Sequence, residues 1–109
     1  MTTLAQKHCV PCEGDVAPMA GAEIGAYLQQ LGKGWMVVGS GRLEKGFHFP
    51  DFVQALNFTN RVGDLAEAEG HHPDIHLSWG HVMVTIWTHA VGGLTESDFV
   101  LAAKTDLLA

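Results

Sequence analysis

Five histidines lie within nineteen residues of this chain, and their chemistry suits proton transfer: His71, His72, His76, His81 and His89. Imidazole exchanges protons near neutral pH and can donate, accept or bind a metal ion. His71 and His72 precede Pro73, whose ring restricts the residue before it to extended backbone and stiffens the turn. A stiff turn that presents two imidazoles could support general acid–base catalysis, although a polar loop could have the same sequence.

A predicted hairpin brings His89 to the same end of the molecule as this turn. Residues 74–79 and 82–89 alternate apolar and polar side chains around Gly80-His81, a two-residue loop with glycine first. Continuing that register places His72 opposite His89, so the sequence predicts that the histidines meet. The predicted pairs on the apolar face are Trp79 with Val82, Leu77 with Val84, and Ile75 with Ile86.

Metal binding and thiol chemistry are the alternatives to acid–base chemistry. Three histidines and Asp74 could ligate zinc, but no histidine pair has the i, i+4 helical spacing of a known zinc motif. Cys9 and Cys12 form half of a zinc ribbon without a second pair. A redox motif would follow a strand at a helix N-terminus, which the surrounding sequence does not offer. We therefore interpret both cysteines as incidental thiols and expect no metal.

Two further side chains are candidates for the same site. Thr95 is a good helix N-cap, and Asp98 three residues later completes a capping box. A carboxylate that begins a helix just after His89 could also orient an imidazole or stabilise its charge. Trp87 lies on the polar face of the hairpin, where its ring could stack on a flat heterocycle.

The elements that must position these residues follow from hydrophobic periodicity. Helices are predicted over residues 20–31, 51–69 and 96–108, and a first hairpin over residues 35–49 with its turn near 39–41. This order predicts an α+β domain whose helices cover one face of an antiparallel sheet. Residues 1–19 are expected to form an irregular N-terminal arm, and residues 20–109 a single domain.

Charge and hydropathy exclude several function classes. The chain has 109 residues and a net charge of −6 with histidines neutral, so it lacks the basic balance of a nucleic-acid binder or of a protein that binds anionic membranes. No apolar run approaches the ~20 residues that span a bilayer. The N-terminus does not have the pattern of a signal peptide, so we expect a cytoplasmic protein with reduced thiols.

The sequence resembles the pterin-4a-carbinolamine dehydratase family over about residues 20–108. The resemblance rests on the following motifs: Gly34-Trp35, Phe47-x-Phe49-x-Asp51-Phe52, Glu67-x-x-x-His71-His72-Pro73-Asp74, Thr88-His89, Gly92-Gly93-Leu94-Thr95-Glu96 and Asp98. The Cys-x-x-Cys arm is similar to that of bacterial members. The family fold is a four-stranded antiparallel sheet with three helices packed on one face.

The resemblance implies a reaction and a site. The reaction is loss of water from 4a-hydroxytetrahydropterin to give quinonoid dihydropterin, which recycles the cofactor of aromatic amino-acid hydroxylases. The implied catalytic residues are His71, His72, His89 and Asp98, and the implied substrate-binding residues are Glu67, Pro73, Trp87, Thr88 and Ala90. The family also implies a homodimer or homotetramer and no metal or organic cofactor.

A non-catalytic role on the same fold is the alternative. Relatives of this fold resemble dimerisation cofactors and assembly factors for other proteins, and the polar sheet face with His76, Ser78 and Thr85 could dock a partner. The three pocket histidines favour the enzyme, because a scaffold would not need them.

Overall fold

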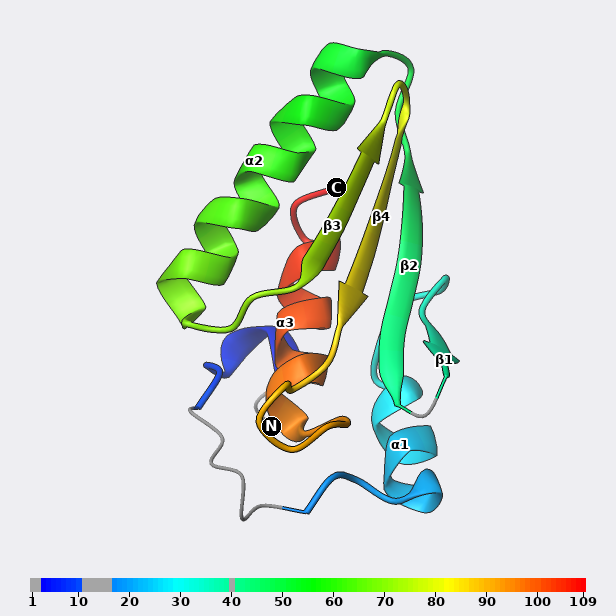
Figure 1. Cartoon of the computed structure of the whole chain (residues 1–109), viewed down its shortest axis with the longest axis vertical. Helices are drawn as coiled ribbons and strands as arrows, with labels where there is room; N and C mark the ends of the chain where they lie inside the picture. Colours follow the sequence, from blue (N-terminus) through cyan, green and yellow to red (C-terminus); the bar gives the residue numbers. More distant parts are fainter. Residues whose placement is uncertain (1–2, 11–16, 40) are drawn as a thin grey trace.

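Two antiparallel hairpins, joined through their inner strands, form the sheet of this chain (Figure 1). The computed structural model describes residues 3–10, 17–39 and 41–109; Ser40, in the first predicted turn, lies outside them. In the described part the strand order is β1-β2-β4-β3, so β2 and β4 are central. The strands are β1 (Met36–Val38), β2 (Arg42–His48), β3 (Asp74–Ser78) and β4 (His81–Ile86).

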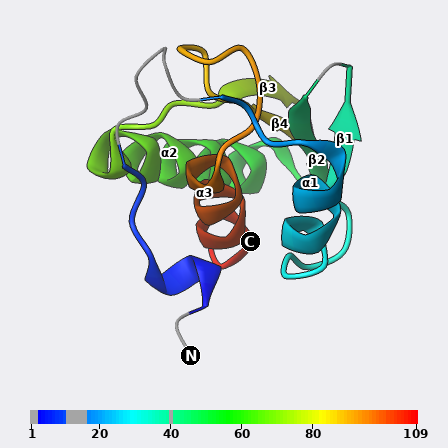
Figure 2. The ribbon, with the colours of Figure 1, turned by 90° about the horizontal axis from the view of Figure 1, so that it is seen from below.

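Three α-helices of the described residues lie on one side of this sheet (Figure 2). They are α1 (Gly21–Leu28), α2 (Phe52–Glu69) and α3 (Glu96–Asp106). The predicted α+β fold is therefore confirmed, and α2 and α3 agree with their predicted ranges to within two residues. The structure also contains no helix, among the residues it describes, that is long and apolar enough to cross a membrane.

Helix α2 leads directly into the histidine turn, and local signals fix both of its ends. Asp51 caps the N-terminus by accepting a hydrogen bond from the Gln54 backbone N–H at 2.9 Å. Gly70 ends the helix in the left-handed conformation, with a φ of 64°, which glycine adopts without a steric penalty. The buried stripe has helical spacing and comprises Ala55, Phe58, Val62 and Ala66.

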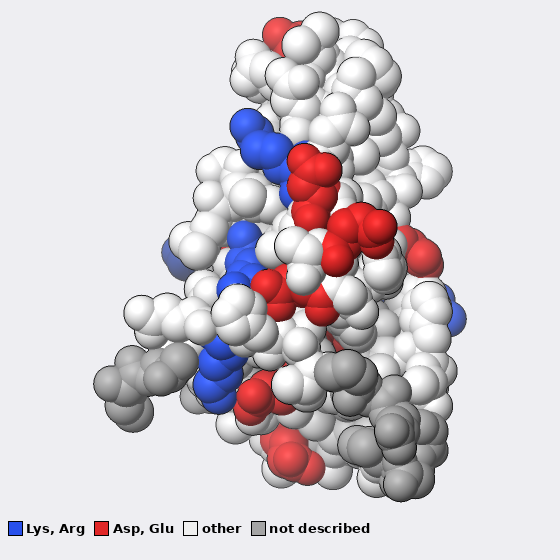
Figure 3. All heavy atoms as spheres, turned by 90° about the vertical axis from the view of Figure 1, so that its left-hand side faces the viewer, with Lys and Arg blue, Asp and Glu red and all other residues white. Residues whose placement is uncertain are grey.

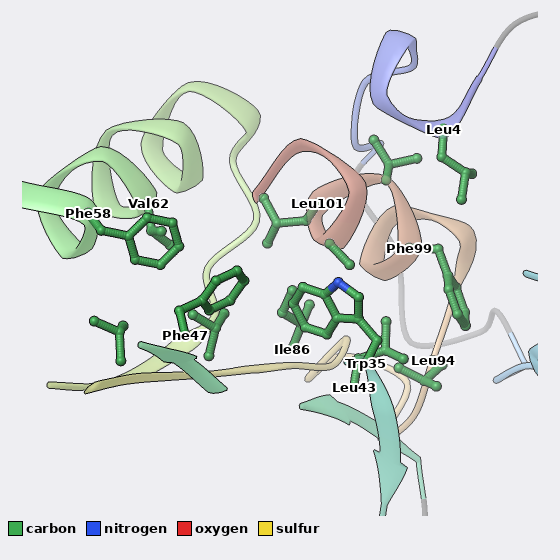
Figure 4. Close-up of a cluster of buried hydrophobic side chains, with 14 of the residues drawn as sticks. Leu4, Trp35, Leu43, Phe47, Phe58, Val62, Ile86, Leu94, Phe99 and Leu101 are labelled. Carbon is green, nitrogen blue, oxygen red and sulfur yellow. The ribbon is translucent and has the colours of Figure 1, made fainter. Parts of the chain in front are cut away.

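The apolar core lies between the sheet and the helices (Figure 4). Phe58 of α2 packs against Phe47 of β2, with ring centroids 4.6 Å apart. From the N-terminal arm, Leu4 of the short 3₁₀ helix η1 (Leu4–Gln6) points toward α3 and is buried. Residues 3–10, expected to be irregular, thus include a helical turn that packs against the body of the protein.

The predicted register of the β3–β4 hairpin is wrong by two residues. Leu77 pairs with Val82 instead of Val84, and Ile75 pairs with Val84 instead of Ile86. Because the shift is even, the apolar side chains still face the core. In this register the position opposite His72 belongs to Trp87, not His89.

The predicted position of Trp79 is wrong because of this register shift. It was expected on the core face, but it lies in the Trp79-Gly80 turn and is 69% exposed. The turn is fixed by the residue that follows β2, since the Phe49 N–H donates to the Gly80 carbonyl at 2.8 Å. A Cβ on Gly80 would lie 2.8 Å from the Phe49 carbonyl oxygen, so this close approach requires glycine.

Candidate functional site

A pocket of about 320 Å³ lies where the histidine turn meets the end of β4. Six predicted site residues line it: His71, His72, Trp87, Thr88, His89 and Ala90. Gly70 and Val10 also line it and were not predicted. The volume is within the range of small-molecule sites. The predicted meeting of His89 with the His71-His72 turn therefore occurs, although not through the predicted strand pair.

His71 is held by a fully buried carboxylate. Its Nε2 lies 2.6 Å from Asp98 Oδ1, and the Asp98 side chain is 0% exposed. As a carboxylate Asp98 only accepts hydrogen bonds, so Nε2 carries the hydrogen of this contact. Nδ1 is then the ring nitrogen of His71 that can exchange a proton. The partner of Asp98 is thus His71, whereas the sequence left open which imidazole it would contact.

The second oxygen of Asp98 is also occupied. Asp98 Oδ2 accepts from the Thr88 hydroxyl at 2.7 Å and from the Thr95 backbone N–H at 2.8 Å. Because the single hydroxyl hydrogen of Thr88 goes to Asp98, the Thr95 hydroxyl is the donor in their mutual 2.9 Å contact. The capping box predicted for α3 is present, and the same carboxylate serves both the helix start and His71. Although Thr88 lines the pocket, its hydroxyl is used to hold Asp98.

His72 and its partner are open to solvent. His72 Nε2 lies 2.5 Å from Glu67 Oε2, with the two side chains 60% and 79% exposed. Glu67 is not among the pocket-lining residues and reaches the site only through this contact. An exposed ion pair of this kind contributes little to the stability of the fold. We therefore interpret the Glu67 contact as one that orients the His72 ring.

His89 belongs to an aromatic stack at the pocket rim. Its ring lies 4.2 Å from the Trp87 ring, centroid to centroid, with 30° between the planes. The Arg42 guanidinium of β2 is also 4.2 Å from the Trp87 centroid, a cation–π contact that restrains the indole. Arg42 was not predicted, because only the pairing of β2 with β4 brings it beside Trp87.

The remaining candidates lie outside the pocket lining. Pro73 is half-buried and links the pocket to β3, while His76 is exposed on β3. His81 stacks on His48 at the far end of β4, with ring centroids 4.7 Å apart, consistent with its interpretation as a bystander. Within the described ranges, no three His, Cys, Asp or Glu side chains gather as a potential metal site. Cys12 lies outside those ranges.

The arm reaches the site through Glu69, at the end of α2. Glu69 accepts from the Cys9 backbone N–H at 2.8 Å, and His8 Nδ1 and Lys104 Nζ lie 3.1 and 3.9 Å from its other oxygen. Burial acts to raise the pKa of Glu69, but the Cys9 N–H, His8 and Lys104 outweigh it and hold that pKa below its ordinary value of 4.5. Burial, together with Glu69, raises the pKa of the Cys9 thiol to about 12, so this thiol is unreactive at neutral pH.

The lowered pKa of Glu69 predicts an acid-sensitive contribution to stability. The charged carboxylate stabilises the folded state above pH 4.5, the ordinary value, and this contribution is lost as pH falls through the lower folded-state pKa. Thermal unfolding of the wild type and of Glu69→Gln, measured from pH 7 to pH 3, should show a difference in Tm that shrinks below pH 4.5. A difference that stays constant over this range would contradict the prediction.

The chain is similar to proteins of a known family. Residues 17–108 match the family model described as pterin 4 alpha carbinolamine dehydratase. A Rickettsia bellii protein named "Putative pterin-4-alpha-carbinolamine dehydratase" is 53% identical over 97% of this chain and 94% of its own length. A protein with the same name from Rubrobacter xylanophilus is 52% identical over 99% of this chain and 100% of its own.

Two solved structures resemble the fold. A transcriptional coactivator/pterin dehydratase from Brucella melitensis is 31% identical, with a TM-score of 0.79 over 84% of this chain and 98% of that one. A pterin dehydratase-like protein described as a RuBisCO assembly factor in the alpha-carboxysome is 29% identical, with a TM-score of 0.62 over 70% of this chain and 89% of that one. The family match and the curated relatives together establish that this chain belongs to the pterin-4α-carbinolamine dehydratase family.

Proposed function

We propose that the chain dehydrates 4a-hydroxytetrahydropterin to quinonoid dihydropterin by histidine acid–base catalysis. The observation that carries the proposal is the contact of His71 with the fully buried Asp98 carboxylate, at one side of a pocket that His72 and His89 also line. Family membership supports the substrate class. Trp87 and the His89 ring stacked on it line the pocket, and Arg42 restrains the indole, so together they offer aromatic surface to a bicyclic heterocycle.

The reaction requires one proton to be removed and one to be supplied. A base takes the N5 proton, the N5–C4a double bond forms, and the C4a–O bond breaks. An acid protonates the departing hydroxyl, so the products are quinonoid dihydropterin and one water. The two transfers leave a protonated base and a deprotonated acid, which exchange protons with solvent before the next turnover.

The contacts of each histidine suggest which role it takes. We assign His71 as the base, because the imidazolium formed when Nδ1 accepts a proton is stabilised by the buried Asp98 carboxylate. His89 and His72 are exposed at the rim and can be reprotonated from water, which suits the acid. Glu67 would orient His72, and Pro73 and Ala90 would shape the substrate site.

Replacement of His89 tests the proposal. In a dehydration assay coupled to a pterin-dependent hydroxylase, His89→Ala should lower kcat about 10²-fold. The expected loss is at the lower end of the range for acid–base groups because water reaches this exposed position and can replace the acid in part. Free imidazole should restore part of the rate.

His76→Ala is the matched control, since His76 is an exposed histidine of β3 outside the pocket. It should retain the wild-type rate. A wild-type chain that is no faster than the uncatalysed reaction would refute the dehydratase proposal altogether.

The cellular setting of this activity is also a proposal. The chain would act in the cytoplasm as a lyase that recycles the tetrahydropterin of an aromatic amino-acid hydroxylase. Residues 20–109 would form the dehydratase domain, with residues 1–19 as its arm. The family model, which matches residues 17–108, supports this division.

Self-association is proposed from the surface of α2. Phe52, Val53 and Leu56 are exposed at its N-terminal end. On the side of the molecule shown in Figure 3, the upper end is almost free of charge, whereas Asp and Glu side chains gather lower down. An exposed apolar group of this kind is typical of an interface. We therefore propose a homodimer or homotetramer that uses this end of α2.

A non-catalytic interaction role is the second candidate. It is favoured by the same apolar end of α2 and by the two similar structures, a transcriptional coactivator/pterin dehydratase and a RuBisCO assembly factor. The two functions differ in their need for the pocket. If an interaction role is the only one, the purified chain will bind no reduced pterin in equilibrium titration.

A further inference from the structure

The described first part of the N-terminal arm, residues 3–10, runs along α3 to the edge of the pocket. Its beginning is anchored in the core by Leu4 and by the Lys104 ammonium, which donates to the Ala5 carbonyl at 3.0 Å. Lys7 then pairs with Glu96 at 3.4 Å. These contacts fix residues 4–7 on α3, so that residues 8–10 arrive beside the pocket in a defined position.

Glu69 is placed where helix energetics alone would not favour an acid. It is the last residue of α2, where the helix dipole disfavours a negative charge, and its side chain is only 8% exposed. The Cys9 N–H, His8 and Lys104 compensate by surrounding the carboxylate with donors. The Glu69 carboxylate is unfavourable for its own helix, but it accepts a hydrogen bond from the arm. Its position is therefore best explained by a role in holding the arm.

Ser97 provides the second attachment of the arm. Its hydroxyl accepts from the Val10 N–H at 3.0 Å and donates to the Val10 carbonyl at 3.2 Å, while the Cys9 thiol lies 3.4 Å from the Ser97 carbonyl. Ser97 precedes Asp98 in the chain, and Glu69 is two residues before His71. The arm is therefore attached to both segments that carry the His71–Asp98 pair.

Val10 is the part of the arm that faces the pocket. It lines the pocket together with the histidines and yet is 63% exposed, an unusual position for an apolar side chain that contributes little to the core. An isopropyl group at a pocket rim gains burial when a ligand covers it, which strengthens ligand binding.

We propose that residues 8–10 form one wall of the substrate pocket and that Glu69 is the positioning residue that holds this wall in place, an inference that rests on the proposed function. Val10 supplies the apolar surface of the wall. Glu69 and Ser97 set its position and touch no substrate. Loss of the wall should weaken substrate binding while the acid–base groups continue to act.

Kinetics of three variants test the wall. Glu69→Ala and Val10→Gly should each raise KM roughly tenfold with kcat within about twofold of wild type, the pattern expected when a binding contact is lost. The dissociation constant of 7,8-dihydropterin, measured by fluorescence titration, should rise by the same factor. The double variant should be no worse than the weaker-binding single variant, because an undocked arm no longer presents Val10.

Asp51→Asn is the control, since it removes a carboxylate from the opposite end of the same helix. It should lower Tm without changing KM. If Glu69→Ala behaves like Asp51→Asn, with a lower Tm and wild-type KM, Glu69 is merely structural and the inference is wrong. A wild-type chain that neither binds nor turns over pterins would instead overturn the proposed function.

The alkylation rate of the Cys9 thiol measures the docking of the arm independently of the kinetics. In a Cys12→Ser background Cys9 is the sole thiol of the chain, and its alkylation at pH 8 should be slow. Adding Ser97→Ala, which removes both hydroxyl contacts to Val10, should accelerate alkylation roughly tenfold as the arm opens. Bound 7,8-dihydropterin should slow alkylation of the docked arm further. An alkylation rate unaffected by both the variant and the pterin would contradict the proposed wall.

Discussion

Asp98→Asn is expected to reduce kcat by about 10²- to 10⁴-fold while the fold is retained. The amide oxygen can replace the carboxylate oxygen that accepts from Thr88 and Thr95. The amide NH₂ then faces His71 Nε2 and donates to it, which moves the ring hydrogen to Nδ1. In that tautomer His71 presents an N–H to the pocket and cannot accept the N5 proton.

Asp106→Asn is the matched control for this prediction. Asp106 is on the same helix and likewise accepts from more than one donor, Trp35 Nε1 at 3.0 Å and Lys45 Nζ at 2.6 Å, but it lies outside the pocket. Its replacement should lower Tm with little effect on kcat. Steady-state kinetics and thermal unfolding of both variants separate the two effects. Equal kcat for Asp98→Asn and wild type would exclude His71 as the base.

Val53→Glu is expected to convert the proposed oligomer to single chains. Val53 is exposed in the first turn of α2, where a glutamate is favoured by the helix dipole, so the monomer fold should not suffer. At an interface, the same charge would be buried without a partner, at a cost of several kcal/mol. Sedimentation velocity should therefore show a species of lower mass.

Gln54→Glu introduces the same charge at the next position without removing apolar surface, and it should leave the oligomer intact. Circular dichroism of both variants verifies the helix. If wild type sediments as one chain, the self-association proposal is wrong; if both variants dissociate, net charge rather than the α2 surface controls assembly.

Much of the fold could be predicted because the local signals agree with it. Asp51 and Gly70 end α2 where the sequence indicates, and the capping box of Thr95 and Asp98 starts α3. The register of the second hairpin could not be predicted in this way. Gly80 was assigned to the first position of a turn, but its contact with Phe49, which follows β2 and is distant in sequence, decides the geometry.

The candidate site could likewise be predicted where it depends on local sequence, and could not where it depends on tertiary packing. The spacing predicted that the His71-His72 turn and His89 lie at the same end of the hairpin, and they do line one pocket, although the predicted register was wrong. Their acid–base chemistry stays a prediction. The partner of Asp98 could not be predicted, because the distance between His71 and α3 depends on how α2 and α3 pack. Val10 and Arg42 carried no signal for the site, since only tertiary contacts bring Val10 to the pocket and Arg42 to the Trp87 ring.

The dual use of Asp98 links catalytic competence to the folding of one helix turn. The first turn of α3 cannot form its capping box without bringing the carboxylate to the position that orients His71. In the proposed mechanism the His71 imidazole is thus oriented before substrate arrives, and little reorganisation remains for the proton-transfer step. A molecule whose α3 frays at Thr95 would lose its base at the same moment, so the fraction of active molecules should follow the fraction with this turn intact.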